Sequence, residues 1–228
     1  MLIPEIGFNA SYLSFLSKPK TVFDVGVGYG TPELYKAYPK ASFILVEPLI
    51  EFQEAIEALS LDYDMQVHYK AVAEKNSVKK INIDTELLQR SSFNERTNLT
   101  KTKNEIDIRK VEVTTLDDIY FSTDSIQAPV LLKIDTEGNE LLVLKGAKEL
   151  LKITDTVIAE VSISKRFHNG YSFDEIVIFM AKNNFEVFSF LKHVQPKGEL
   201  RQRFVDVVFK RKSLNKSSKS DVASIAGS

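Results

Sequence analysis

The sequence contains no cysteine, and this absence removes several kinds of chemistry. Without thiols the chain cannot form a disulfide framework, use a thiolate nucleophile or bind zinc through sulfur. Neither sign of charge is in excess, since 30 basic residues stand against 31 acidic ones. A balanced chain has no electrostatic footprint for a nucleic acid or an anionic membrane, so we expect no nucleic-acid partner. The partner must therefore be inferred from a site.

Long apolar segments are also absent. No stretch approaches the roughly 18 consecutive apolar residues that indicate a membrane-spanning helix. The first 20 residues, MLIPEIGFNASYLSFLSKPK, lack the basic start, the apolar run and the small-residue cleavage site of a secretory signal. We therefore expect a soluble, cytoplasmic protein with no membrane span.

Strand and helix patterns alternate along most of the 228 residues, which is typical of an α/β domain whose mostly parallel sheet is covered by helices on both faces. The segment MQVHYKAVAE predicts a third strand, with SVKKINID paired beside it, and the segments FEVFSFL and RFVDVVFKRK predict a closing antiparallel hairpin. We predict one domain over residues 1–212, because chains of up to about 250 residues often form a single domain. Residues 213–228 are rich in Ser and Lys and predict a disordered tail. Residues 84–110 are polar, and we treat them as a candidate lid.

A glycine-rich loop follows the first predicted strand in the segment TVFDVGVGYG. Glycines in the first strand-to-helix loop let a ligand approach the backbone, so we predict that Asp24, Gly26, Gly28 and Gly30 bind a cofactor. The dinucleotide fingerprint would place its last glycine where Thr31 stands, which argues against NAD. An acid before the first glycine suits the cationic amino-acid end of S-adenosylmethionine better than a pyrophosphate, which a carboxylate would repel.

A second cofactor signal lies at the end of the next predicted strand, ASFILVEP. Its Glu47 comes 19 residues after Gly28, and an ionised carboxylate can accept hydrogen bonds from both hydroxyls of a ribose. This feature fits NAD and S-adenosylmethionine equally well. We include Glu47 and the following Pro48 in the predicted cofactor site.

Two carboxylates follow a buried strand in the segment LLKIDTEGNELLVLKGA. In open α/β sheets ligands bind beyond the carboxyl ends of the strands, which is where Asp135 and Glu137 stand. A positioned general base accelerates a reaction by about 10²–10⁴-fold. We predict Asp135 as the base that accepts the proton of an alcohol, and Glu137 as the second choice. The alternatives are that Asp135 forms the turn and that Glu137 stabilises the start of the next helix.

His168 is a third catalytic candidate, in the loop after the predicted strand VIAEVS. Histidine titrates near neutral pH and can act as a base or an acceptor ligand, although a lone loop histidine is often merely solvated. Glu160 ends that strand and adds a third acid to Asp135 and Glu137. Three oxygen ligands could hold Mg²⁺. We predict no metal site and keep this arrangement as the alternative.

The sequence resembles the FkbM-type S-adenosylmethionine-dependent methyltransferases. The resemblance spans roughly residues 20–165 and is carried by FDVGVGYG, ILVEP, the pair Ser91-Ser92, VEVTTLDDI, LLKIDTEGNELLVLKGA and VIAEVS. It implies a seven-stranded class I methyltransferase fold, S-adenosylmethionine as cofactor, and transfer of a methyl group, commonly to a hydroxyl of a sugar or natural product. A small-molecule or glycan acceptor is therefore the expected partner. The glycine loop departs from the family, which more often has a small residue and an Asn-Ile type pair where Val27 and Tyr29 stand.

Two other functions fit parts of the sequence. An NAD-dependent sugar-modifying enzyme would share the glycine loop and Glu47, although it needs the other glycine spacing. A methyltransferase-fold protein that binds the cofactor without catalysis would account for the unusual GVGYG loop. Calorimetry with both cofactors separates the first alternative, and binding without turnover would favour the second.

Overall fold

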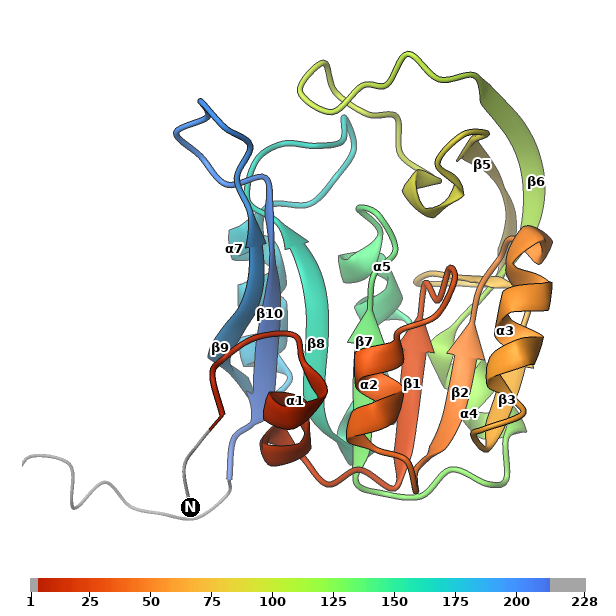
Figure 1. Ribbon diagram of the computed structural model, residues 1–228, viewed down its shortest axis with the longest axis vertical. Helices are drawn as coiled ribbons and strands as arrows, with labels where there is room; N and C mark the ends of the chain where they lie inside the picture. Colours follow the sequence, from red (N-terminus) through yellow and green to blue (C-terminus); the bar gives the residue numbers. More distant parts are fainter. Residues whose placement is uncertain (1–3, 214–228) are drawn as a thin grey trace, which may run out of the picture.

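The computed structural model describes residues 4–213, whose strands form two sheets of unequal size (Figure 1). The larger sheet has seven strands in the order β3-β2-β1-β7-β8-β10-β9. Neighbouring strands are parallel except for the two pairs that β10 makes with β8 and β9. The strands are β1 Thr21–Val25, β2 Ser42–Val46, β3 Met65–His68, β7 Val130–Ile134, β8 Thr154–Ser162, β9 Phe185–Val194 and β10 Phe204–Arg211.

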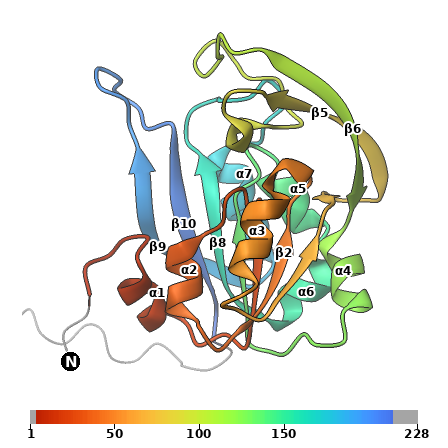
Figure 2. The same ribbon diagram turned by 45° about the vertical axis from the view of Figure 1, so that its right-hand side comes forward.

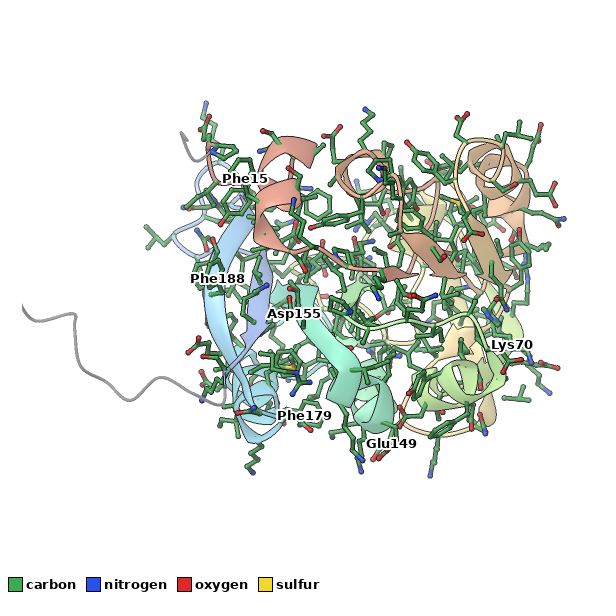
Figure 3. All side chains as sticks on the ribbon, turned by 90° about the horizontal axis from the view of Figure 1, so that it is seen from below. Phe15, Lys70, Glu149, Asp155, Phe179 and Phe188 are labelled. Atoms are coloured by element: carbon green, nitrogen blue, oxygen red, sulfur yellow. The ribbon has the colours of Figure 1, made fainter. Side chains whose placement is uncertain are left out.

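Helices cover both faces of this sheet and make three layers. Seen from below, Phe15 lies in one outer layer, and Glu149 and Phe179 lie in the other (Figure 3). The two layers enclose separate apolar cores, one on each face of the sheet. The first layer contains α1 Ala10–Leu16, α2 Pro32–Ala37, the 3₁₀ turn η1 Ile50–Phe52 and α3 Gln53–Leu59, and the second contains α4 Leu116–Ser122, α5 Glu140–Lys145, α6 Lys148–Ile153 and α7 Phe173–Lys182.

Local sequence accounts for most of these elements. All residues of β1 and of β7 are buried, as expected of central strands covered on both faces. Helix α7 begins with a capping box, in which Ser172 and Glu175 bind each other's backbone N–H groups. Helix α2 has a proline at its first position, and the side chain of the preceding Thr31 makes no capping hydrogen bond.

The smaller sheet was predicted wrongly. Its strands are β4 Ala71–Val72, β5 Ser77–Asp84 and β6 Ile106–Thr114, in the order β4-β6-β5. The predicted third strand breaks after His68, where the Lys70 N–H donates to the His68 carbonyl, and the chain leaves the large sheet. Strand β5 then pairs antiparallel with β6 instead of with β3. Strand β6 begins inside the polar segment that the sequence left unassigned.

The segment between β5 and β6 is the insert, residues 85–105, which contains the 3₁₀ turn η2 Leu88–Arg90. The small sheet and the insert lie above the carboxyl ends of β1, β2 and β7 (Figures 1 and 2). This is the edge of the large sheet at which a doubly wound α/β fold binds its ligand.

The large sheet confirms the expected architecture, a class I methyltransferase fold with a mostly parallel seven-stranded sheet and a closing antiparallel hairpin. Within residues 4–213, no helix has both the length and the apolar character needed to cross a membrane. Apart from Ser213, the tail predicted for residues 213–228 lies outside the described residues, so its disorder stays a prediction.

Candidate active site

A cavity of about 570 Å³ opens at the carboxyl ends of β1, β2, β7 and β8. Its floor is made by the residues that end these strands or directly follow them. The insert and the small sheet form its roof, and the N-terminal arm and the β9–β10 hairpin contribute one wall. Residues far apart in the sequence therefore share one concave site.

The predicted glycines line the floor of this cavity. Gly26 has a φ of +77°, and a Cβ atom there would lie 1.8 Å from the carbonyl oxygen of Asp135. Only glycine lets the loop pass so close to the turn after β7. Gly28 donates its backbone N–H to Glu47 Oε2 at 2.9 Å. At Gly30 a Cβ atom would lie 2.6 Å from Leu59 Cδ1, so this glycine also lets the loop pack on α3.

Glu47 is 5% exposed, and its side chain joins two backbone segments at the cavity. Its two oxygens accept N–H groups from Gly28 and Leu49 at 2.9 and 3.0 Å. Burial raises the pKa of Glu47 to about 7, against the opposing effect of these hydrogen bonds. Each oxygen keeps a second lone pair for a ligand. The adjacent Pro48 also lines the cavity.

Asp24 occupies a different place from the predicted one. It is fully buried and is not among the residues that line the cavity. Its carboxylate accepts a hydrogen bond from the Tyr35 hydroxyl at 2.7 Å and lies 3.1 Å from Lys133 Nζ. Lys133 in turn donates to the carbonyl of Gly26 at 3.3 Å. In this structure Asp24 is therefore connected to the glycine loop through Lys133, and its direct contact with a cofactor stays a prediction.

Asp135 lies at the cavity surface with a 39% exposed side chain. Within residues 4–213 its carboxylate makes no hydrogen bond, and the nearest cation is Lys133, 3.9 Å away. Burial alone would lower the pKa of Lys133, but the carboxylates of Asp24 and Asp135 raise it above its usual value. Lys133 is therefore a permanent positive charge close to the partly exposed Asp135 side chain.

Glu137 is held much more tightly than Asp135. It has a φ of +52°, which is uncommon for a residue with a side chain. Its carboxylate, 16% exposed, forms ion pairs with Arg166 and, at 3.2 Å, with Arg96. Its carbonyl accepts a hydrogen bond from Ser92 Oγ at 2.6 Å. These contacts fasten the turn after β7 to the insert and to the loop after β8.

The helix-start role considered for Glu137 belongs to Glu140. Glu140 Oε1 accepts the backbone N–H groups of Thr136 and Gly138, each at 3.0 Å. Its other oxygen accepts the Tyr171 hydroxyl at 2.7 Å. Burial raises the pKa of Glu140. In this turn the Glu140 carboxylate therefore accepts backbone N–H groups, whereas the Glu137 carboxylate pairs with side chains of neighbouring loops.

The three-acid metal alternative does not match the geometry. Arg166, 4% exposed, lies 2.5 Å from Glu160 Oε1 through Nη1 and also binds Glu137. Burial and the nearby carboxylates of Asp135 and Glu137 raise the pKa of Glu160. Among residues 4–213, no group of three His, Asp or Glu side chains is arranged to hold a metal ion.

His168 does not reach the site. It is exposed, is not part of the cavity lining, and donates its backbone N–H to the Glu95 carbonyl at 3.0 Å. The preceding residues Arg166 and Phe167 are the buried ones of this loop. The structure therefore does not bring His168 together with the other predicted site residues, and its catalytic role stays a prediction.

The insert lines one side of the cavity, and its role as a lid stays a prediction. Opposite Gly28 it presents Gln89, whose Cγ would lie 3.3 Å from a Cβ atom on that glycine. At its far end, the Thr97 N–H and the Thr100 hydroxyl donate to the Arg166 carbonyl at 2.9 and 2.8 Å. Both ends of this roof are thus in contact with residues of the site.

Sequence reasoning missed Phe8, Arg166, Lys192 and Asp206. Phe8, Lys192 and Asp206 line the cavity, and Arg166 neutralises two of its acids. Burial and the Asp135 carboxylate raise the pKa of Asp206 to about 6. One signal was visible, because Asp206 interrupts an otherwise apolar strand, and an acid among core residues often marks a functional site.

Comparison with known proteins places the chain in a family. Residues 24–187 match the family model described as the methyltransferase FkbM domain. A search among curated proteins found no match.

Several solved methyltransferases are similar in structure. A TehB-like methyltransferase from Corynebacterium glutamicum is 10% identical, with 91% of this chain and 89% of that chain covered and a TM-score of 0.46. The ribosomal protein L11 methylase of Lactobacillus delbrueckii is 16% identical, with 90% and 79% covered and a TM-score of 0.45. Magnesium protoporphyrin IX methyltransferase from Synechocystis is 11% identical, with 89% and 76% covered and a TM-score of 0.45.

Proposed function

Because the chain belongs to the FkbM family of S-adenosylmethionine-dependent methyltransferases, we propose that it methylates a hydroxyl group of a sugar, glycan or other natural product. The observation that carries this proposal is the Asp135 carboxylate. It follows the strand next to the glycine loop, faces the cavity and has no hydrogen-bond partner among the described residues. A hydroxyl acceptor needs such a group, because it must lose a proton when it is methylated.

The residues of the floor fit the cofactor. Glu47 has unused lone pairs for two ribose hydroxyls, and the glycine loop leaves its backbone open to an amino-acid group. Bound there, S-adenosylmethionine supplies an electrophilic methyl group. The cavity of about 570 Å³ is within the usual size range of small-molecule sites.

The chain's own residues then have separate tasks. Asp135 accepts the proton of the acceptor hydroxyl at a carboxylate oxygen. Lys133, at 3.9 Å, balances its charge and also holds the Gly26 carbonyl, so the base and the glycine loop keep a fixed relation. The roof excludes water and aligns the two reactants, and alignment can supply much of the acceleration.

The two alternatives carry less weight than methyl transfer. The match to the methyltransferase family model argues against the NAD-dependent enzyme. The silent binding protein rested on the unusual loop, whose Tyr29 is 56% exposed, packs edge-on against Phe52 and is not part of the cavity lining. The Tyr29 side chain therefore does not occupy the cavity in which the reaction is proposed to take place.

The experiment is to incubate the protein with S-adenosylmethionine carrying a labelled methyl group and a panel of hydroxylated sugars, glycolipids and their amino analogues. We expect the label in an O-methyl ether, located by mass spectrometry and NMR. A product labelled only on nitrogen would overturn the proposal.

A further inference from the structure

One wall of the cavity lies outside the part of the chain that matches the family. The match covers residues 24–187. Of the described residues that line the cavity, three fall outside this range: Phe8, Lys192 and Asp206. The floor lies within the part of the chain that matches the family model, whereas the three residues of this wall lie outside it.

The three residues come from segments that contact one another. Lys192 is on β9 and Asp206 is on the adjacent β10. The pairing shifts between Val205 and Val207, so Asp206 stands opposite two residues of β9, as in a β-bulge. Bulges re-aim side chains and are frequent next to active sites.

The N-terminal arm completes the wall. It crosses the hairpin in front of β9 and β10 (Figure 1). A Cβ atom on Gly7 would lie 3.9 Å from the carbonyl oxygen of Leu191, and Phe8 packs on the core cluster that contains Leu191. An aromatic ring is thereby placed beside the end of the hairpin that carries Lys192.

The positive charges of Lys192 and Lys133 act on Asp206 through space, but neither lysine forms an ion pair with it within residues 4–213. On the next strand, Glu160 stands opposite Asp206, but Glu160 is bound to Arg166. Within the part of the chain that the structure describes, Asp206 and Lys192 make neither an ion pair nor a side-chain hydrogen bond. Both residues line the cavity, so neither has to give up a direct partner to bind a ligand.

We propose that Phe8, Lys192 and Asp206 select the acceptor, and that this acceptor is a hydroxylated ring that carries a carboxylate. The inference rests on the proposed function and names its substrate class. The apolar face of the ring packs on Phe8, a ring hydroxyl donates to Asp206, and the carboxylate of the acceptor pairs with Lys192. The position of Lys192 gives the ring one orientation, because an anion placed beside Asp206 instead would be repelled by its carboxylate.

The first test is a calorimetric titration of the protein, saturated with S-adenosylhomocysteine, with glucuronate, glucose and glucosamine as probes. We expect glucuronate to bind at least about tenfold more tightly than either of the others, as one charge-assisted contact allows. Lys192→Ala should remove this preference and leave the affinity for S-adenosylhomocysteine unchanged. Lys197→Ala is the matched control, because Lys197 is exposed in the hairpin and does not line the cavity.

The second test examines the other two residues. Asp206→Asn and Phe8→Ala should each lower the affinity for glucuronate and for glucose by about tenfold. Their controls, Glu186→Gln on β9 and Phe15→Ala on α1, change exposed residues outside the cavity lining and should not affect either sugar. All four variants should bind S-adenosylhomocysteine as the parent does.

The outcomes separate this inference from the proposed function. Three results would overturn the proposal that Phe8, Lys192 and Asp206 select the acceptor. They are equal affinity for glucuronate and glucose, no binding of any of the three sugars, and unchanged affinities in Lys192→Ala. Such results would leave O-methylation of another hydroxyl acceptor standing. A methyl label found only on nitrogen would overturn the proposed function, whatever the wall residues do.

Discussion

The floor of the cavity and its surrounding turns and loops are held by different kinds of contact. On the floor, backbone hydrogen bonds join neighbouring strand ends: Gly26 N–H to the Val46 carbonyl and Asp135 N–H to the Val25 carbonyl, each at 2.9 Å. Around the floor, long side chains join distant segments, above all Arg166 and Arg96, which meet on Glu137.

This difference teaches how each part should respond to substitution. A backbone contact fixes a position to within a fraction of an ångström. A substitution that adds an atom on the floor therefore overlaps neighbouring atoms that cannot move away. A side-chain network spreads its energy over several partners, and the loss of one is shared by the rest. We therefore expect abrupt effects on the floor and graded effects around it.

The largest effect is expected from Gly26→Ala. The added Cβ atom would overlap the Asp135 carbonyl oxygen at 1.8 Å, and alanine is disfavoured at a φ of +77°. We expect the free energy of unfolding to fall by more than about 3 kcal/mol, measured by denaturant titration, with loss of S-adenosylhomocysteine binding.

Gly198→Ala is the matched control, because Gly198 also has a positive φ of +86° but has nothing within 4 Å of its Cβ position. It should cost only the conformational term of about 1–2 kcal/mol. If the two variants were equally stable, the contact between the glycine loop and the turn after β7 would not matter.

Asp135→Asn should have the next largest effect, on rate alone. The amide keeps the shape of the side chain but cannot take the acceptor proton, so the methyl-transfer rate should fall by about 10²-fold or more. Calorimetry should show an unchanged affinity for S-adenosylhomocysteine. His168→Gln is the control, since His168 is exposed and outside the cavity. A dead His168→Gln beside an active Asp135→Asn would reverse the assignment.

The fold was predictable where the local pattern decides it. The alternation of strands and helices predicted the mostly parallel sheet and its closing hairpin, because the central strands are mostly apolar and buried along their length, and amphipathic helices cover them. The smaller sheet was not predictable from pattern alone. The pairing of β5 with β6 depends on a long polar connection, whose residues carry no hydrophobic periodicity.

The site divides in the same way. Gly26, Gly28, Glu47 and Pro48 follow the ends of their strands, and strand order then brings them together. Arg166 could not be recognised, because its partners Glu137 and Glu160 meet it only through tertiary folding.

The two acids of the turn after β7 show the limit most clearly. Glu137 and Glu140 both precede or open α5, and sequence offered Glu137 for the helix start. The φ of +52° at Glu137 accompanies a side chain bound to Arg166 and leaves Glu140 to receive the backbone N–H groups. This dihedral angle depends on contacts with distant loops, so it cannot be predicted from the local sequence.

Glu47→Gln tests whether the floor binds the cofactor through a charge. Replacing the carboxylate by an amide should weaken the binding of S-adenosylhomocysteine by about 1.5–3 kcal/mol, measured by calorimetry near pH 8. For the parent, affinity should fall as the pH drops below about 7, because burial raises the pKa of Glu47 to about 7 and the protonated group accepts fewer hydrogen bonds. The variant should lack this dependence.

The same pKa shift has the opposite sign for folding. Because the pKa of Glu47 is higher in the folded protein than its usual value of 4.5, its protonated form favours folding. This contribution is complete below pH 4.5 and is lost as the pH rises through about 7. Cofactor binding and unliganded stability should thus change in opposite directions between these values. A parallel change would show that Glu47 does not bind the ligand as an anion.

The smallest effect is expected from Glu137→Gln, away from the floor. Glutamine keeps the side-chain length but loses the charge, while Arg166 keeps Glu160 and Arg96 keeps its hydrogen bond to the Arg90 carbonyl at 2.8 Å. Because these partners remain, we expect a loss of about 1–2 kcal/mol in the free energy of unfolding, below the 3–5 kcal/mol of a buried pair left without compensation. Thermal and denaturant unfolding measure this loss, and the methyl-transfer rate should change far less than in Asp135→Asn. An inactive but fully stable Glu137→Gln would instead place Glu137 in the chemistry, and the contrast between a rigid floor and a shared network around it would fail at its central residue.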